Sequence, residues 1–167
     1  ELNIKRIESL VGIKEKGITT EIISNDARKL TDTYGGSQLL GDESVDLILT
    51  SPPYAGAQKY IRSSWLNLYW LGKKQPEEIR LLNSKNIGRE DYHKSDFNQK
   101  VKTDISASDV VLESLYKEGK YERAYIVGNY LNEIKLAFDE SMRVLKKGGY
   151  MVIVIGNNTV CDRPFDT

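Results

Sequence analysis

The residues with the clearest chemical potential lie in the stretch VDLILTSPPY, from Val45 to Tyr54. Ser51 supplies a hydroxyl group and Tyr54 supplies an aromatic ring. Between them, Pro52 and Pro53 fix the backbone φ angles, so oxygen atoms on this turn are held in place before a ligand arrives. The same residues also make an ordinary strand terminator with a surface tyrosine, because proline cannot donate to a sheet ladder. The tetrapeptide alone leaves both interpretations open.

Polar residues follow two other predicted strands. Residues 19–30 (TTEIISNDARKL) begin with β-branched residues, and we expect this strand to leave its sheet at Asn25 and Asp26. Asn157 and Asn158 follow the apolar run YMVIVIG, which spans residues 150–156. Asn and Asp commonly end strands, so plain turns are the alternative at both places.

The elements that position these groups are visible as hydrophobic patterns. Apolar runs predict buried strands at Val45–Leu49 and Tyr150–Gly156. Helical spacing predicts helices over residues 3–16, Tyr60–Gly72, Ser106 or Ser108 to Leu115, and Ile126–Leu145. The predicted ends of these helices are Gly17, Gly72, Gly119 and the pair Gly148-Gly149, with Lys146 and Lys147 in the last turn of the longest one. The aromatic stripe of the second helix, which includes Trp65 and Trp70, is typical of a core face.

Residues 73–105 differ in composition from the rest of the chain. They are polar and show no sustained period, and the part from Lys73 to Thr103 has eight basic and five acidic residues. A connection of this length is usually functional or disordered. We interpret it as an insert that is either flexible and solvated or in contact with the target.

The overall composition excludes several classes of protein. The chain has 167 residues, enough for one domain, and its 24 basic and 24 acidic residues cancel, which argues against indiscriminate nucleic-acid binding. One cysteine, Cys161, and one histidine, His93, exclude a disulfide framework and make Cys/His metal chemistry an unfavourable interpretation. No apolar run approaches the roughly 18 residues of a membrane span, so the cytoplasm is the simplest location.

Strands separated by helices predict an α/β structure with a parallel sheet. Ligands of such sheets bind beyond the carboxyl ends of the strands. We therefore expect three strand ends to converge, namely Asn25-Asp26, Ser51 to Tyr54, and Gly156 to Asn158. This convergence favours a functional role for the Ser51–Tyr54 turn.

On these elements the residues resemble a known family, the S-adenosylmethionine-dependent DNA methyltransferases that act on exocyclic amino groups. The strand VDLILT with the SPPY turn resembles the family signature, and NDAR (residues 25–28) lies where such enzymes carry an acidic residue near the cofactor. SSWLNLYWLG (residues 63–72) and RVLKKGGYMVIVIGNN (residues 143–158) are similar to later family segments. The resemblance spans Thr19 to Asn158. It implies a partial Rossmann-like class I methyltransferase fold over residues 1–167, with a mostly parallel sheet and flanking helices.

The resemblance also implies roles for individual residues. The Ser51 hydroxyl and a carbonyl group in the Ser51-Pro52 segment would accept hydrogen bonds from the target amine, cytosine N4 or adenine N6, and free the nitrogen lone pair. Pro52 and Pro53 would hold these acceptors, and Tyr54 would stack on a target base flipped out of duplex DNA. The cofactor S-adenosylmethionine would contact Asp26, Ala27 and Ser51. Arg62 would contact DNA phosphates, although a solvated surface charge is the alternative.

One feature of the family is missing. No Gly-x-Gly sequence occurs in the chain, so the glycine-rich cofactor loop is absent. We expect the chain to be a fragment of a methyltransferase whose cofactor loop lies outside it. The predicted order of helix and strand at residues 3–30 favours an upstream position for this loop. The alternative is a degenerate domain that has lost the donor site. RNA or protein-amide methyltransferases of the same fold are a further alternative, but they use Asn or Asp where this chain has Ser51.

Overall fold

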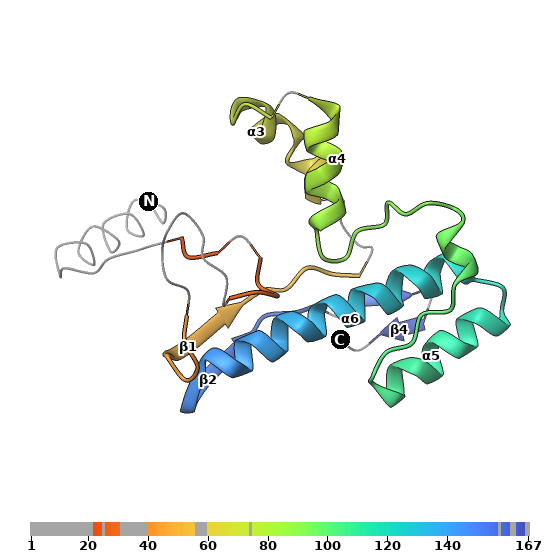
Figure 1. The fold of residues 1–167 in the computed structure, drawn as a ribbon. Coiled ribbons are helices and arrows are strands. Elements are labelled where there is room, and N and C mark those ends of the chain that lie inside the picture. The colour runs from red at the N-terminus through yellow and green to blue at the C-terminus, as the bar shows by residue number, and fades with distance from the viewer. Residues whose placement is uncertain are drawn as a thin grey trace, which may run out of the picture.

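The structure is a computed structural model that describes residues 22–24, 26–30, 40–55, 60–73, 75–156, 158–160 and 163–165. The helix expected over residues 3–16, together with Asn25, Asn157 and Cys161, lies outside the described residues. The described elements are arranged as a small sheet, a layer of two helices and a projecting arm of shorter helices (Figure 1).

The central sheet pairs β1 (Val45–Thr50) in parallel with β2 (Leu145–Ile153), which confirms the expected parallel pairing. The register runs from Leu47 opposite Tyr150 to Thr50 opposite Ile153. One more hydrogen bond, from the backbone N–H of Val154 to the carbonyl oxygen of Thr50 at 2.9 Å, extends the ladder. The carboxyl ends of the two strands therefore lie side by side. Separately, β3 (Asn158–Val160) and β4 (Arg163–Phe165) form an antiparallel hairpin.

The long helix α6 (Tyr121–Val144) ends earlier than the glycine pair predicted. The backbone N–H groups of Glu43 and Ser44 donate to the carbonyl oxygens of Arg143 and Val144, at 3.0 and 2.8 Å. The loop before β1 thus takes over helix-end carbonyl groups that a glycine cap would otherwise satisfy.

Lys146 and Lys147 consequently belong to β2, and their predicted place in the last helical turn is wrong. The Lys146 ammonium group instead reaches Asp46 on β1, at 2.8 and 3.0 Å. Gly148 has a φ of +80° and lies where the strand register shifts. Glycine adopts this left-handed backbone without strain, so it allows the irregularity in the β1–β2 pairing.

The core lies between α6 and α5 (Ser106–Lys117). The predicted α6 face is confirmed in its central part, where Ile126, Val127, Tyr130 and Ile134 are buried, but Met142 is 61 % exposed. The start of α5 is fixed by Asp109, whose carboxylate accepts from the backbone N–H of Thr103 at 2.8 Å and from its hydroxyl at 2.9 Å. The main buried residues of this cluster are Ala55, Leu112, Leu115, Tyr116, Ala124, Val127, Tyr130, Leu131 and Ile134.

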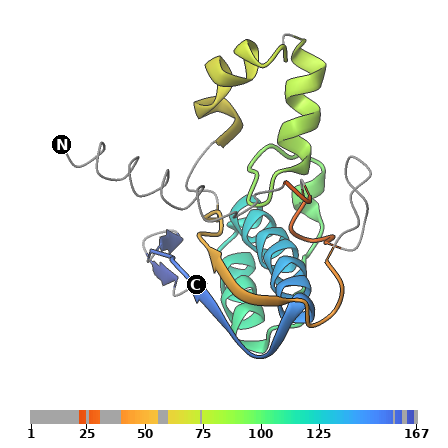
Figure 2. The same cartoon turned by 90° about the vertical axis from the view of Figure 1, so that its left-hand side faces the viewer.

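The arm consists of α2 (Tyr60–Ser63), α3 (Trp65–Trp70) and α4 (Pro76–Lys85), and it projects away from the sheet and from α6 (Figures 1 and 2). The single helix expected from Tyr60 to Gly72 is therefore two short helices. We did not predict α4, nor the short 3₁₀ helix η1 (Asp96–Asn98), within the polar segment. Pro76 at the first turn and a capping box between Gln75 and Glu78 were the signals for α4.

Burial differs most from prediction in the sheet and in α3. Leu49 of β1 is 71 % exposed and Tyr150 of β2 is 74 % exposed, because the described sheet has two strands and the described helices α5 and α6 lie on one side of it (Figure 2). The interpretation of the aromatic stripe as core is also wrong. Trp65 is 52 % and Trp70 81 % exposed, since α3 lies in the projecting arm.

Candidate active site

The Ser51–Tyr54 turn follows β1 directly and lies at the carboxyl end of the parallel sheet. Pro52 is buried, Pro53 and Tyr54 are half-buried, and Ser51 is exposed. Within the described part of the chain, the Ser51 hydroxyl group has no hydrogen-bond partner. A buried proline therefore anchors the turn while the serine oxygen is left available to a ligand.

Tyr54 joins this turn to two other segments. Its hydroxyl oxygen accepts a hydrogen bond from the backbone N–H of Gly156, just beyond β2, at 3.0 Å. Its own backbone N–H donates to the hydroxyl oxygen of Tyr60, the first residue of α2, at 3.2 Å. The expected convergence of the β1 and β2 ends is thus present, and the base of the arm is tied to the same residue.

Gly88 packs against the backbone carbonyl group of Tyr54. It has a φ of +77°, and a Cβ atom there would lie 2.9 Å from the Tyr54 carbonyl oxygen and 3.4 Å from Cδ2 of Tyr130. Only glycine meets both conditions without strain or displacement. The sequence shows Gly88 merely as a glycine in a polar segment, so neither its role nor that of Tyr60 was predicted.

Asp26 does not follow a strand in the described structure. Residues 22–24 are not in a strand, and Asp26 begins a turn in which the Lys29 N–H donates to its carbonyl oxygen at 3.1 Å. The prediction that a third strand ends at Asn25-Asp26, beside the other two, is therefore wrong for the described residues. A short polar turn replaces the strand, because the Asp26 side chain bonds its own backbone neighbours.

The Asp26 carboxylate forms an ion pair with Arg28. The guanidinium of Arg28 donates to both carboxylate oxygens at 2.9 Å, and the Arg28 backbone N–H donates to one of them at 3.0 Å. These hydrogen bonds hold the pKa of Asp26 below its usual value. Ala27, between the two, is exposed.

Arg28 also ties this turn to the rest of the molecule. It reaches the Glu133 carboxylate of α6 at 3.4 Å and donates to the carbonyl oxygen of Lys85, at the end of α4, at 3.1 Å. Burial raises the pKa of Glu133, and the charge of Arg28 opposes that rise. Sequence patterns did not single out Glu133, because a lone acid on a long helix is usually a solvated residue.

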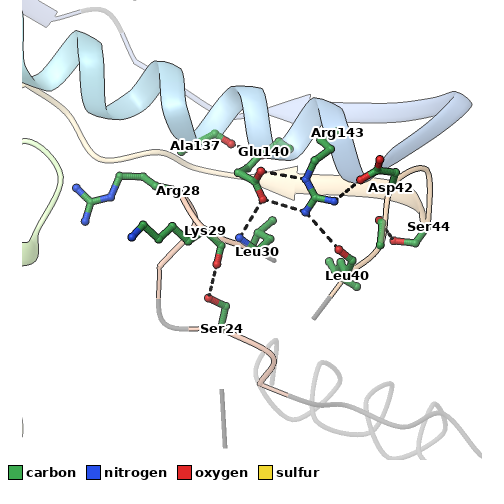
Figure 3. Close-up of polar contacts among 12 residues, drawn as sticks. Ser24, Arg28, Lys29, Leu30, Leu40, Asp42, Ser44, Ala137, Glu140 and Arg143 are labelled. Atoms are coloured by element: carbon green, nitrogen blue, oxygen red, sulfur yellow. Dashed lines mark hydrogen bonds and ion pairs between the residues drawn. The ribbon is translucent and has the colours of Figure 1, made fainter. Parts of the chain in front are cut away.

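A second arginine, Arg143, holds the segments that precede β1 (Figure 3). It donates to Glu140 at 2.9 and 3.0 Å, to Asp42 at 2.6 Å and to the carbonyl oxygen of Leu40 at 3.2 Å. Glu140 in turn accepts from the backbone N–H of Leu30 at 3.0 Å. The end of α6 therefore fixes both the Asp26–Leu30 turn and the approach to β1.

Arg62 lies on α2, two residues after Tyr60, and its side chain is exposed. It lines a cavity of about 730 Å³ in the arm, together with residues of α3 and α4. Tyr60 connects α2, the helix that carries Arg62, to the Ser51–Tyr54 turn.

Two other kinds of site were sought in the described residues. No group of three or more His, Cys, Asp or Glu side chains there could hold a metal ion. No helix in that part of the chain is long and apolar enough to cross a membrane.

The model of the N6/N4 DNA methylase family matches residues 45–163. The match begins at the first residue of β1 and includes the Ser51–Tyr54 turn, the arm, α6 and β2, but it does not reach Asp26 or Ala27. This chain belongs to the N6/N4 DNA methylase family, the amino-methyltransferases of DNA. Neither a curated protein nor a solved structure matches it.

Proposed function

We propose that this chain carries the amine-activating part of an S-adenosylmethionine-dependent DNA methyltransferase that modifies cytosine N4 or adenine N6. The observation that carries the proposal is the exposed Ser51 hydroxyl without a described partner, on a turn fixed by buried Pro52 and by the contacts of Tyr54. Family membership supports the same reaction class. The parallel pair of strands with helices in its crossover supports a partial Rossmann-like class I fold.

Ser51 and the carbonyl group of the Ser51-Pro52 segment act by accepting hydrogen bonds. The lone pair of an exocyclic amine is delocalised into the base, so acceptors that draw on its N–H groups make the nitrogen a better nucleophile. The donor would supply a methyl group to this nitrogen, its C–S electron pair would stay on sulfur, and the amine would lose one proton to solvent. Positioning dominates such a displacement, and the two prolines provide it.

S-adenosylmethionine, when bound, supplies a methyl group on a positively charged sulfur. Asp26, Ala27 and Ser51 would hold it. The Asp26 side chain is 32 % exposed, and its oxygens, although engaged by Arg28, retain lone pairs for a further donor. The Asp26 carboxylate can therefore accept a hydrogen bond from an adenosyl amine, while the chain has no Gly-x-Gly sequence to complete that site.

Tyr54 is proposed to stack on the flipped target base. Stacking of a base on an aromatic ring typically contributes about 1–3 kcal/mol. The hydrogen bond from Gly156 fixes the hydroxyl end of the ring, so its orientation is set before DNA binds. Arg62 is proposed to contact a DNA phosphate next to the flipped nucleotide.

The test is Ser51→Ala in the protein that contains this chain, measured by tritiated methyl incorporation into DNA. We expect donor binding to be nearly unchanged and transfer to fall about 100-fold, the usual scale for losing one positioned hydrogen bond to the reacting group. Ser63→Ala is the matched control, because Ser63 is exposed on α2 and bonds only the Tyr60 carbonyl oxygen of its own turn. Unchanged incorporation by Ser51→Ala would remove the acceptor role.

A further inference from the structure

The cavity in the arm, of about 730 Å³, has walls from three helices. Tyr60 and Arg62 come from α2, Trp65 from α3 and Arg80 from α4. Its size lies within the usual range for small-molecule and nucleotide sites. We call it the arm cavity.

Two arginines of the arm cavity, Arg62 and Arg80, have no ion-pair partner among the described residues. Both are exposed. Arg89, also in the wall, stacks its guanidinium 4.2 Å from the centre of the Tyr92 ring, and its Nε atom is buried without a hydrogen-bond partner among the described groups. All three present donors suited to an anion.

The two acids of the arm cavity are already engaged. Glu90 pairs with Arg123 of α6 at 3.3 Å, and Asp91 accepts from the side-chain amide of Asn83 at 3.2 Å. Arg123 balances the charge of Glu90, whereas Asp91 keeps its negative charge because its amide partner is neutral. The three arginines of the wall, Arg62, Arg80 and Arg89, therefore exceed the remaining acid. The local charge is positive, although the chain as a whole has no net charge.

The remaining wall suits a planar ring. Trp65 and Tyr60 offer aromatic surface, and Asn86 offers an amide that can donate to and accept from a base edge. An anion-binding end with arginines beside aromatic rings and amides matches the chemistry of a nucleotide. A phosphate alone would not need the aromatic part, and an apolar ligand would not need the arginines.

The position of the arm cavity separates it from the reacting base. Ser51, Pro52, Pro53 and Tyr54 do not line it, yet Tyr60 lines it and accepts the hydrogen bond of the Tyr54 N–H. We propose that the arm cavity binds a second nucleotide of the target DNA strand, adjacent to the flipped one, with its phosphate on Arg62 and Arg80. This inference rests on the proposed function, because the flipped nucleotide defines which strand is held.

The experiment measures DNA binding by fluorescence anisotropy, with the full chain and fluorescein-labelled duplexes that contain one unpaired cytosine or adenine. The variant is Arg62→Ala with Arg80→Ala, and the control is Lys117→Ala with Lys135→Ala, two cations on α5 and α6 that do not line the arm cavity. We expect the slope of log K against log salt to become shallower by about one for each arginine. Trp65→Ala, which keeps both charges, should weaken binding roughly fivefold or more with an unchanged slope.

Three results would overturn the inference. The first is an unchanged slope, the second is an equal change in the lysine control, and the third is a change seen only with RNA of the same sequence, which would assign the arm cavity to RNA. Methyl transfer to the same duplexes is measured in parallel with the protein that contains this chain. Transfer without the expected slope change would remove this inference and keep the proposed function. The slope change without transfer would show DNA binding by the arm cavity, but it would remove the proposed function and with it the place of the bound nucleotide next to a flipped one.

Discussion

The backbone N–H of Tyr54 donates a hydrogen bond of 3.2 Å to the hydroxyl oxygen of Tyr60. This bond joins the turn after β1 to the first helix of the arm. The hydroxyl of Tyr54 is held separately by Gly156. Tyr60 therefore holds the backbone of the Ser51–Tyr54 turn, and Gly156 holds the end of the Tyr54 ring. Tyr60 is therefore a positioning residue for the turn that carries Ser51.

Tyr60→Phe should loosen the turn without removing its reactive groups. We expect a loss of about 1 kcal/mol in the free energy of unfolding, the usual net value of one hydrogen bond. In an enzyme assay, kcat should fall while the KM for DNA stays nearly constant, because the phenylalanine ring still lines the arm cavity. Steady-state kinetics with labelled donor measures both.

The control for this change is Tyr121→Phe. Tyr121 lies at the start of α6, is 50 % exposed, and its ring is near that of Tyr116, away from the Ser51–Tyr54 turn. A parallel fall of kcat in both variants would show that Tyr60 has no special part in positioning.

Gly88→Ala should disturb Tyr54 at its carbonyl group, whereas Tyr60 acts on its N–H. Its Cβ atom would meet the Tyr54 carbonyl oxygen at 2.9 Å, and the φ of +77° adds strain. We expect the free energy of unfolding to fall by about 2–3 kcal/mol and methyl transfer to fall with it. Urea denaturation and transfer assays measure the two effects.

Gly119→Ala is the control that separates backbone strain at positive φ from the steric clash with Tyr54. Gly119 has a similar φ of +74° at the end of α5, but nothing lies within 4 Å of its Cβ position. It should lose only about 1 kcal/mol, from the left-handed backbone, and keep its activity. Equal losses in the two variants would mean that the contact with Tyr54 costs nothing.

Asp26→Asn should give a pH-dependent loss of stability. The hydrogen bonds from Arg28 lower the pKa of Asp26, so this pair stabilises the fold above the ordinary pKa of 3.8 and the contribution disappears as pH falls through the lowered value. Because the carboxylate is 32 % exposed, we expect only about 0.5–1 kcal/mol near pH 7. Urea unfolding across the acid range should show the variant and the parent protein converging at low pH.

Arg28→Ala provides the background for that measurement. Once the Arg28 side chain is absent, Asp26→Asn should have a smaller effect, because only the backbone N–H of residue 28 and the charge of Lys29 still favour the carboxylate. A full loss in the Arg28→Ala background would assign the stabilisation to another partner of Asp26.

Local patterns predicted the elements that a single segment specifies. We could predict β1 and β2 from their apolar runs, and α5 and α6 from their helical periods. The parallel pairing of β1 and β2 was also predicted, as was the convergence of the Ser51–Tyr54 turn with Gly156 at the strand ends. These features depend on composition and spacing within each element. The Ser51–Tyr54 turn stood out for the same reason.

Features decided by distant contacts could not be predicted in this way. The end of α6 at Val144 depends on the loop before β1, and the role of Gly88 depends on the Tyr54 carbonyl group. The exposure of Trp65 depends on α3 lying in the arm. Each of these results from tertiary contact overriding a local preference.

Binding of S-adenosylmethionine to the 167-residue chain should be weak. Asp26, Ala27 and Ser51 are proposed to contact part of the donor, but the sequence has no Gly-x-Gly loop whose backbone could approach the rest of it closely. We expect isothermal titration calorimetry to show no micromolar binding, and the addition of a segment that carries such a loop to restore it. Micromolar affinity of the chain alone would mean that residues other than a glycine-rich loop complete the donor site, and Asp26→Ala would then show whether the Asp26 turn belongs to it.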